Sequence, residues 1–393
     1  MALGTAVGAG ARDPGGAASA GVAGVGWVVA HAGTTHAGTP HWVLGALTLV
    51  GLVAAVGGWR VLRDADASTR LGVGLVAAGV LAVIAGGIGL VEIQIAPRDA
   101  PAWTEWFDAV NAAVSVLLAV GSLAVVRRRW PERPRYVGLG LLLAAWIGYP
   151  SLMPDSGLSN PLGYPLAVAV PVAVGYLLYR DAGDGLRRVG GARLPAALSD
   201  LRSAVVAGVS FVLFAVFFAF SAGTMTLAPD VTAEIAGEGF VRTYVVASPL
   251  VYWPAVEFYV PSIPLSGYVS VGTVLLVGLL GGLVALNAAL VARQWEADGA
   301  VQSPRAMVGT VAASGATACC CCAPALYGAL GVVLGAAASP VYWAFMDPSS
   351  PVGGLFFAAS VLVLTGSAIR ASHDPACAIP RDPDASGAAE RAA

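Results

Sequence analysis

The chain has 393 residues, of which 57% are hydrophobic and only 11% are charged, and this balance excludes an ordinary soluble globular protein. All 21 basic residues are arginine, because the sequence contains no lysine. A retinal or pyridoxal phosphate (PLP) Schiff base and a phosphate-loop lysine are therefore excluded, so we expect no retinal, PLP or nucleotide cofactor. The net charge of -2 offers no basic surface for nucleic acid.

Residues 1–41 precede the first apolar stretch. Within them, 18–30 is a weak apolar run that ends in small residues, which is typical of a cleavable export signal or of a flexible Gly/Ala tail. His31, His36 and His41 then follow at spacings of five residues. Neutral imidazoles bind copper or zinc, so this segment is either a metal-collecting site outside the membrane or an exposed spacer.

Nine apolar stretches follow, each long enough to cross a bilayer core of about 30 Å, which takes roughly 20 residues of helix. None shows the alternation of a barrel strand, so the predicted fold class is all-α, a polytopic transmembrane helix bundle. We expect it in the lipid bilayer of the plasma membrane. The stretches are 42–59, 71–95, 108–126, 136–153, 161–179, 203–227, 266–292, 306–337 and 352–369.

Arginine is distributed unevenly between the connecting loops. Every second loop, beginning after the first stretch, is rich in arginine, whereas the loops between them carry only Arg98 and Arg242 together with several acids. Positive residues near the ends of spans mark the cytoplasmic side, so the pattern predicts the N-terminus outside and the C-terminus inside. Residues 371–393 are polar and rich in proline, which predicts a disordered cytoplasmic tail.

Two long loops organise the chain. The longest inner one, 180–202, is an Arg-rich linker between a five-helix half at 42–179 and a four-helix half at 203–370. The longest outer one, 228–265, combines acidic with aromatic residues. Aromatic residues at this depth are expected to form an interfacial belt, and a lid over a ligand is the alternative.

The most unusual feature is a run of four consecutive cysteines, Cys319, Cys320, Cys321 and Cys322, inside the eighth stretch. Cys319 and Cys322 share a helix face at a spacing of three residues. Two thiolates on one face suit a soft ion such as Cu(I) or Zn(II), or a reversible disulfide. Pro324 removes the amide that would bond to the carbonyl of Cys320, which predicts a break in the helix beside the thiols.

Two interpretations of this cluster stay open. Cys319 follows Arg305 by 14 residues, about 21 Å along a helix, which predicts that the thiols lie nearer the outer side. Outer imidazoles followed by buried thiolates would suit the passage of copper. Alternatively, the cysteines are small packing residues, helped by Gly331 and Gly335 at GxxxG spacing.

The C-terminal quarter, 266–370, has an Arg-bearing inner loop, a Gly/Ala-rich run, clustered Cys and Pro, and a final helix. In this it resembles a group of uncharacterised prokaryotic polytopic membrane proteins with a Cys-rich helix. At the paired Cys before Pro alone, it is loosely similar to mercuric transport proteins and to thiol-transferring membrane proteins of cytochrome c maturation. The latter pattern has a second, distant intramembrane cysteine, whereas Cys377 here lies in the tail. The resemblance thus weakens a disulfide relay and leaves a local, metal-bound thiol pair open.

Few other polar residues fall within the stretches. Glu92, toward the outer end of the second stretch, is a functional candidate because ionisable groups inside membranes are costly, and Asn287 in the seventh is expected to form an interhelical hydrogen bond. No histidine lies within a stretch, so haem is not expected. The motifs HExxH and GxSxG are absent, and catalysis is not the favoured interpretation.

The leading hypothesis is therefore an integral membrane protein that binds or transports a soft metal ion, with copper favoured and Cys319 and Cys322 as the inner ligands. One alternative is a non-catalytic subunit or assembly factor of a larger membrane complex, whose partners are other membrane proteins or a second copy of the chain. Another is a membrane thiol-disulfide oxidoreductase.

Overall fold

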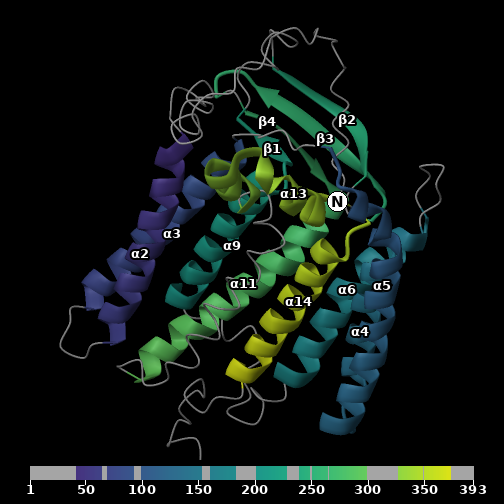
Figure 1. Cartoon of the computed structure of the whole chain (residues 1–393). Helices are drawn as coiled ribbons and strands as arrows, with labels where there is room; N and C mark the ends of the chain where they lie inside the picture. The colour runs from purple at the N-terminus through teal and green to yellow at the C-terminus, as the bar shows by residue number, and fades with distance from the viewer. Residues whose placement is uncertain are drawn as a thin grey trace, which may run out of the picture.

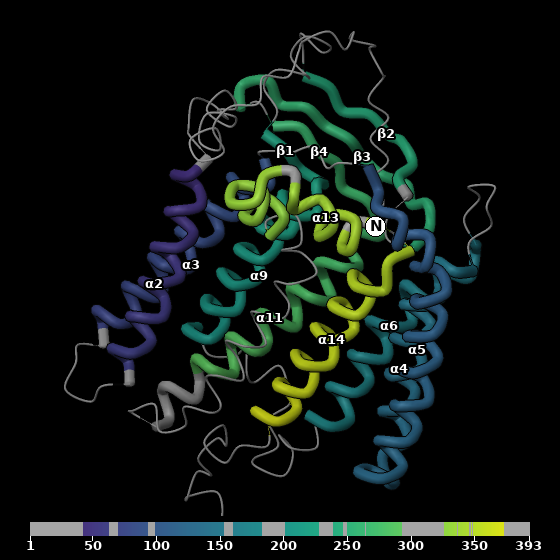
Figure 2. Tube along the Cα trace, in the orientation of Figure 1, coloured from purple at the N-terminus to yellow at the C-terminus, as the bar shows by residue number. Residues whose placement is uncertain are grey.

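Helices form the body of the protein, and a small antiparallel sheet covers one end of them (Figures 1 and 2). The fold comes from a computed structural model, which describes residues 41–63, 69–92, 99–152, 160–182, 201–227, 239–247, 250–263, 265–298, 326–347 and 349–372.

Six described helices are long and apolar enough to cross a membrane. Uninterrupted runs of Leu, Val, Ala and Ile form them, and inside a bilayer a helix satisfies its own backbone hydrogen bonds. They include α2 (His41–Arg63), α3 (Thr69–Glu92), α4 (Phe107–Arg129, preceded by the 3-10 turn η1, Ala102–Trp106), α9 (Leu201–Ser221), α11 (Val271–Asp298) and α14 (Pro351–Ser372).

Shorter elements complete the helical part. Proline shapes two of them, because α5 stops shortly before Pro150 and α6 contains Pro171. Residues 326–334 are also helical. The shorter elements are α5 (Arg135–Gly148), η2 (Pro150–Leu152), α6 (Gly163–Leu177) with its π-helical extension η3 (Leu178–Ala182), η4 (Gly335–Ala338) and α13 (Ser339–Met346).

The predicted membrane helix bundle is thus confirmed as a class of fold. Eight of the nine apolar stretches coincide with helices of the described residues. Most of the eighth stretch in the chain, 306–337, lies outside the described residues, which resume at 326.

The all-α prediction missed the sheet, which has the strand order β1-β4-β3-β2 with every neighbouring pair antiparallel. Its strands are β1 (Met225–Thr226), β2 (Phe240–Ala247), β3 (Tyr252–Val260) and β4 (Leu265–Ser270). Strands β2 and β3 lie within 228–265, for which the sequence predicted an interfacial belt or a lid, and both of these roles stay predictions. The predicted stretches on either side of this loop, 203–227 and 266–292, were also too long, because α9 ends at Ser221 and α11 begins at Val271.

A local backbone signal turns the chain out of α9. Gly223 has a φ of 66°, the left-handed conformation that glycine adopts without cost, and the amide of Thr224 then donates to the carbonyl of Ala219 at 2.9 Å. Along β3, Trp253, Ala255 and Tyr259 are buried while Tyr252 is exposed, which is the two-residue period of a strand. We call the face that carries these buried residues the inner face of the sheet.

The hydrophobic core lies where α5, α6, α11 and α14 meet. Leu143, Val170 and Val361 are fully buried there, and the rings of Trp146 and Phe357 stack at 4.4 Å between centroids. The hairpin of α2 and α3 lies at the side of this core, next to α9 (Figure 1).

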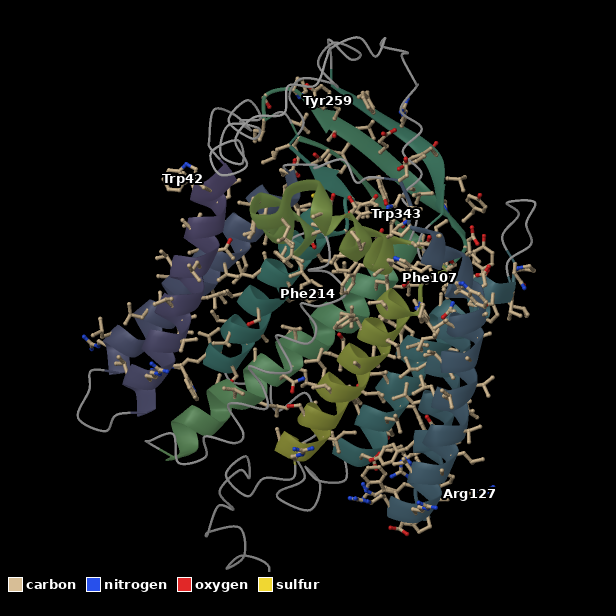
Figure 3. All side chains as sticks on the ribbon, viewed as in Figure 1. Trp42, Phe107, Arg127, Phe214, Tyr259 and Trp343 are labelled. Carbon is tan, nitrogen blue, oxygen red and sulfur yellow. The ribbon has the colours of Figure 1, made fainter. Side chains whose placement is uncertain are left out.

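The arginine-rich ends of the helices lie away from the sheet. Figure 3 labels Arg127, at the C-terminal end of α4, at the opposite end of the molecule from Tyr259 of β3. The C-terminal ends of α2 and α14 also point away from the sheet, and these helices end near Arg60 and Arg370 (Figure 1). The arginine-bearing ends of these three described helices therefore lie at one end of the bundle.

Candidate functional site

The last residue of α3, Glu92, joins the helix bundle to the sheet. Its side chain is buried, with 4% of the residue exposed. One carboxylate oxygen, Oε2, accepts hydrogen bonds from Oγ1 of Thr226 at 2.8 Å and from the amide of Leu227 at 3.1 Å. These two hydrogen bonds join the end of α3 to strand β1 and to the residue that follows it.

Residues 326–334 contact the same end of α3 at very short range. A Cβ atom on Gly328 would lie 2.3 Å from the carbonyl oxygen of Leu90, so only glycine fits at this position. Leu90 itself is 2% exposed. Gly328, which follows Pro324 by four residues, therefore lies against α3 two residues before Glu92.

Most of the predicted metal ligands lie outside the described residues. This holds for the four cysteines Cys319–Cys322 with Pro324, and for His31 and His36. His41 begins α2, and its side chain also lies outside the description. Within the described part of the chain, no three His, Cys, Asp or Glu residues are grouped as a metal site would require. The thiolate and imidazole sites stay predictions.

Asn287 forms the interhelical contact expected from the sequence. The residue is 3% exposed, and its Nδ2 donates to the carbonyl of Leu283 on α11 at 2.8 Å and to that of Leu364 on α14 at 3.1 Å. Its amide thereby links two core helices, which is a structural role.

A row of polar residues crosses the inner face of the sheet. Arg242 of β2 lies opposite Glu257 of β3, which in turn lies opposite Tyr268 of β4. Nε of Arg242 donates to Oε2 of Glu257 at 2.5 Å, and this hydrogen bond raises the pKa of the guanidinium. The guanidinium also stacks over the ring of Phe240, at 5.0 Å from its centroid. The charges of the row therefore neutralise each other.

The hydroxyl of Tyr268 is buried without a hydrogen-bond partner among the described residues. Burial, followed by the neighbouring Tyr244, raises its pKa to about 12. The ring of Tyr244 meets that of Tyr268 edge-on, with 5.9 Å between centroids. A buried hydroxyl without a partner costs stability, because it has lost its hydrogen bonds to water.

Replacement of Tyr268 by phenylalanine is therefore expected to raise the free energy of unfolding by about 1 kcal/mol at neutral pH. The folded pKa lies above the ordinary value of 10, so the unfolded chain releases this proton first, and wild-type stability falls as the pH rises above 10 toward 12. The Tyr268→Phe variant should not show this loss of stability at alkaline pH. Thermal melting in detergent at pH 8 and pH 11 measures both effects.

The matched control is Tyr164→Phe, since the hydroxyl of Tyr164 donates to the carbonyl of Tyr252 at 2.5 Å. That variant should lose stability. If both variants lose stability equally, the hydroxyl of Tyr268 has a partner in solution and the prediction is wrong.

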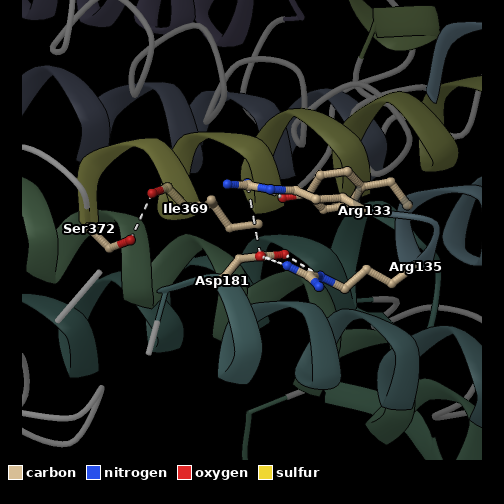
Figure 4. A network of polar contacts seen from close by, with 6 residues as sticks. Arg133, Arg135, Asp181, Ile369 and Ser372 are labelled. Carbon is tan, nitrogen blue, oxygen red and sulfur yellow. Dashed lines mark hydrogen bonds and ion pairs between the residues drawn. The ribbon is translucent and has the colours of Figure 1, made fainter. Parts of the chain in front are cut away.

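An ion-pair network at the arginine-rich end was missed by the sequence analysis (Figure 4). Asp181 in η3, with a side chain only 3% exposed, accepts a hydrogen bond from Nε of Arg135 at 3.0 Å and a second one from Nη2 of the same guanidinium. Nη1 of Arg133 lies 3.9 Å from Oδ1 of Asp181 and donates to the hydroxyl of Tyr136 at 3.2 Å.

Burial opposes ionisation of Asp181, but the hydrogen bonds from Arg135 and Tyr136 outweigh it and hold the pKa of the carboxyl below its usual value. An acid directly after an apolar stretch was the only signal in the sequence. Its partner Arg135 lies 46 residues away, so the pairing required the fold.

Comparison of the chain with protein-family models, with curated proteins and with solved structures gives no match.

Proposed function

We propose that the chain is a multi-pass plasma-membrane protein, with its N-terminus outside and its C-terminus inside, that binds or moves a soft metal ion, most favourably copper. Cys319 and Cys322 are the inner ligands of this proposal, with Cys320 and Cys321 beside them. His31, His36 and His41 are the outer collecting residues.

The observation that carries the proposal is the path of the chain on either side of the cysteines. Helix α11 leaves the sheet at Val271 and, over 28 residues, extends about 42 Å toward the arginine-rich end. The described chain resumes at residue 326, beside the sheet end of α3. The segment that joins these two ends contains Cys319–Cys322, and the described residues on either side of it lie at opposite ends of the bundle. This supports a ninth crossing with its thiols toward the sheet end.

The same contact sets an upper limit on the distance between the proposed thiol ligands and a buried carboxylate. Gly328 follows Cys322 by six positions, and six steps along the chain span at most about 21 Å. Gly328 touches Leu90, two residues before Glu92. Soft ions prefer thiolate ligands, so the cysteines would bind the metal, and Glu92 would contribute negative charge at the same end of the bundle.

Metal analysis of the purified full-length protein tests the proposal. Protein from cells grown with copper should contain bound copper, and the double variant Cys319→Ser/Cys322→Ser should lose it. Cys377→Ser is the matched control, because it removes a thiol outside the cluster and should keep the metal. If wild type holds no more metal than the double variant, the proposal is wrong.

A second candidate, a non-catalytic subunit or assembly factor, is favoured by the outward face of the sheet. This face carries no charged side chain among the described residues, although a sheet face directed at water is normally polar. Val241 is 75% exposed and Val245 61% exposed. The residues of the face are Val241, Thr243, Val245, Tyr252, Pro254, Val256, Phe258, Val260, Gly267 and Val269. Purification with a stoichiometric partner protein, retained by the cysteine double variant, would favour this candidate.

A further inference from the structure

Helix α4 ends in three consecutive arginines, Arg127, Arg128 and Arg129, all of which are exposed. None of them forms an ion pair with another described residue. They lie at the end of the bundle opposite the sheet, where Figure 3 labels Arg127. The nearest acid in the sequence, Glu132, forms no ion pair with another described residue, so the three guanidiniums outnumber it and leave net positive charge at this end of α4.

Two of these arginines continue an apolar stripe on the outside of α4. A spacing of 11 residues is close to three full turns, so Arg127 lies on the same face as Val116, and Arg128 on the same face as Leu117. Val116, Leu117 and Val120 are 61%, 70% and 60% exposed. The stripe is about 16 Å long, which is close to half of a bilayer core of about 30 Å.

The neighbouring acids balance only part of this charge, because Glu132 is a single carboxylate beside three arginines. Asp181 is occupied by Arg135, and the guanidinium of Arg133, with a side chain 38% exposed, lies 3.9 Å from it. Next to the arginines, the indole of Trp130 is 43% exposed and meets Tyr136 edge-on at 5.8 Å. An exposed tryptophan beside a basic cluster is typical of the depth of the lipid headgroups.

We propose that the end of α4 binds the phosphate group of an anionic phospholipid through Arg127 and Arg128, with the acyl chains of the lipid along the stripe that begins at Val116 and Leu117. Guanidinium groups suit this ligand because each can donate two parallel hydrogen bonds to phosphate oxygens. The stripe has the length of one leaflet, so headgroup and acyl chains are held by one continuous surface. This site is separate from the proposed metal ligands.

The experiment uses the full-length protein, stripped of lipid in neutral detergent and titrated with phosphatidylglycerol or with phosphatidylcholine of the same acyl chains. Native mass spectrometry counts the bound lipid. Phosphatidylglycerol should bind more tightly to the wild type. Arg127→Gln/Arg128→Gln should weaken it about 30-fold, from roughly 1 kcal/mol per arginine, and leave phosphatidylcholine unchanged.

The matched control is Arg70→Gln/Arg370→Gln, which removes the same charge from two separate helices, and it should weaken binding no more than about threefold. Equal losses in the two double variants would show a general charge effect and overturn the proposal. Inorganic phosphate at millimolar concentration distinguishes a lipid from a free anion. If it displaces phosphatidylglycerol completely, the site recognises phosphate alone and the lipid assignment is wrong.

Discussion

Replacement of Gly79 by alanine is expected to lower the free energy of unfolding by about 2 kcal/mol. A Cβ atom at this position would lie 2.5 Å from the amide nitrogen of Ala55 and 2.6 Å from the carbonyl oxygen of Gly51. Both atoms belong to the backbone of α2, so no side-chain rotation relieves the overlap, and α2 and α3 must move apart. In a membrane, helices associate mainly by such close packing of small residues.

The loss should be seen by thermal melting in detergent, with Gly74→Ala as the matched control in the same helix. Nothing lies within 4 Å of a Cβ atom at Gly74, so that variant keeps the packing and gains helix propensity, up to about 1 kcal/mol. Opposite shifts in melting temperature are therefore expected from the same chemical change. Equal shifts would mean that α2 and α3 are not closely packed in solution.

The helices were predictable because their signal is local. In lipid, an apolar run such as Leu201–Ser221 can satisfy its backbone hydrogen bonds only as a helix. The arginine pattern also agrees with the structure, because the described helix ends that carry arginine in α2, α4 and α14 lie at one end of the bundle. The seven-residue spacing of Gly72, Gly79 and Gly86 is also visible in the sequence. The partners of these glycines on α2 cannot be seen in the sequence, because Gly51 contacts Gly79 and Gly58 contacts Gly72 only when the two helices pack together.

The sheet was missed because β3 has apolar residues on both of its faces. Alternation of polar and apolar residues is the usual signal for a strand, but in β3 the buried Trp253 and Ala255 alternate with exposed Tyr252, Pro254 and Val256. The run was therefore assigned to the outer loop 228–265, while most of β1 and β4 was assigned to the apolar stretches on either side. The side that is exposed could be assigned only from the pairing of the strands.

The candidate site was predicted in part. Glu92 was singled out correctly as a buried acid, but its role as a link to β1 depends on Thr226 and Leu227, which belonged to a predicted helix. Asn287 was predicted correctly because a lone amide in an apolar helix needs an interhelical partner. The Asp181 network could not be predicted, since an ion pair between distant loops leaves no periodic trace in the sequence.

Replacement of Asp181 by asparagine is expected to destabilise the protein by about 2 kcal/mol at neutral pH, because the amide keeps only one of the two oxygens that accept hydrogen bonds from Arg135 and leaves the guanidinium charge uncompensated. The folded pKa of Asp181 lies below its ordinary value of 3.8, so the carboxylate contributes stability above that pH, and the contribution disappears as the pH falls through the folded pKa. The gap in stability between wild type and Asp181→Asn should therefore narrow between pH 7 and pH 3. Thermal melting of both proteins at the two pH values measures the gap, and Asp181→Asn/Arg135→Gln should recover part of the loss. A gap that stays constant with pH would assign the destabilisation to altered packing rather than to the lost charge.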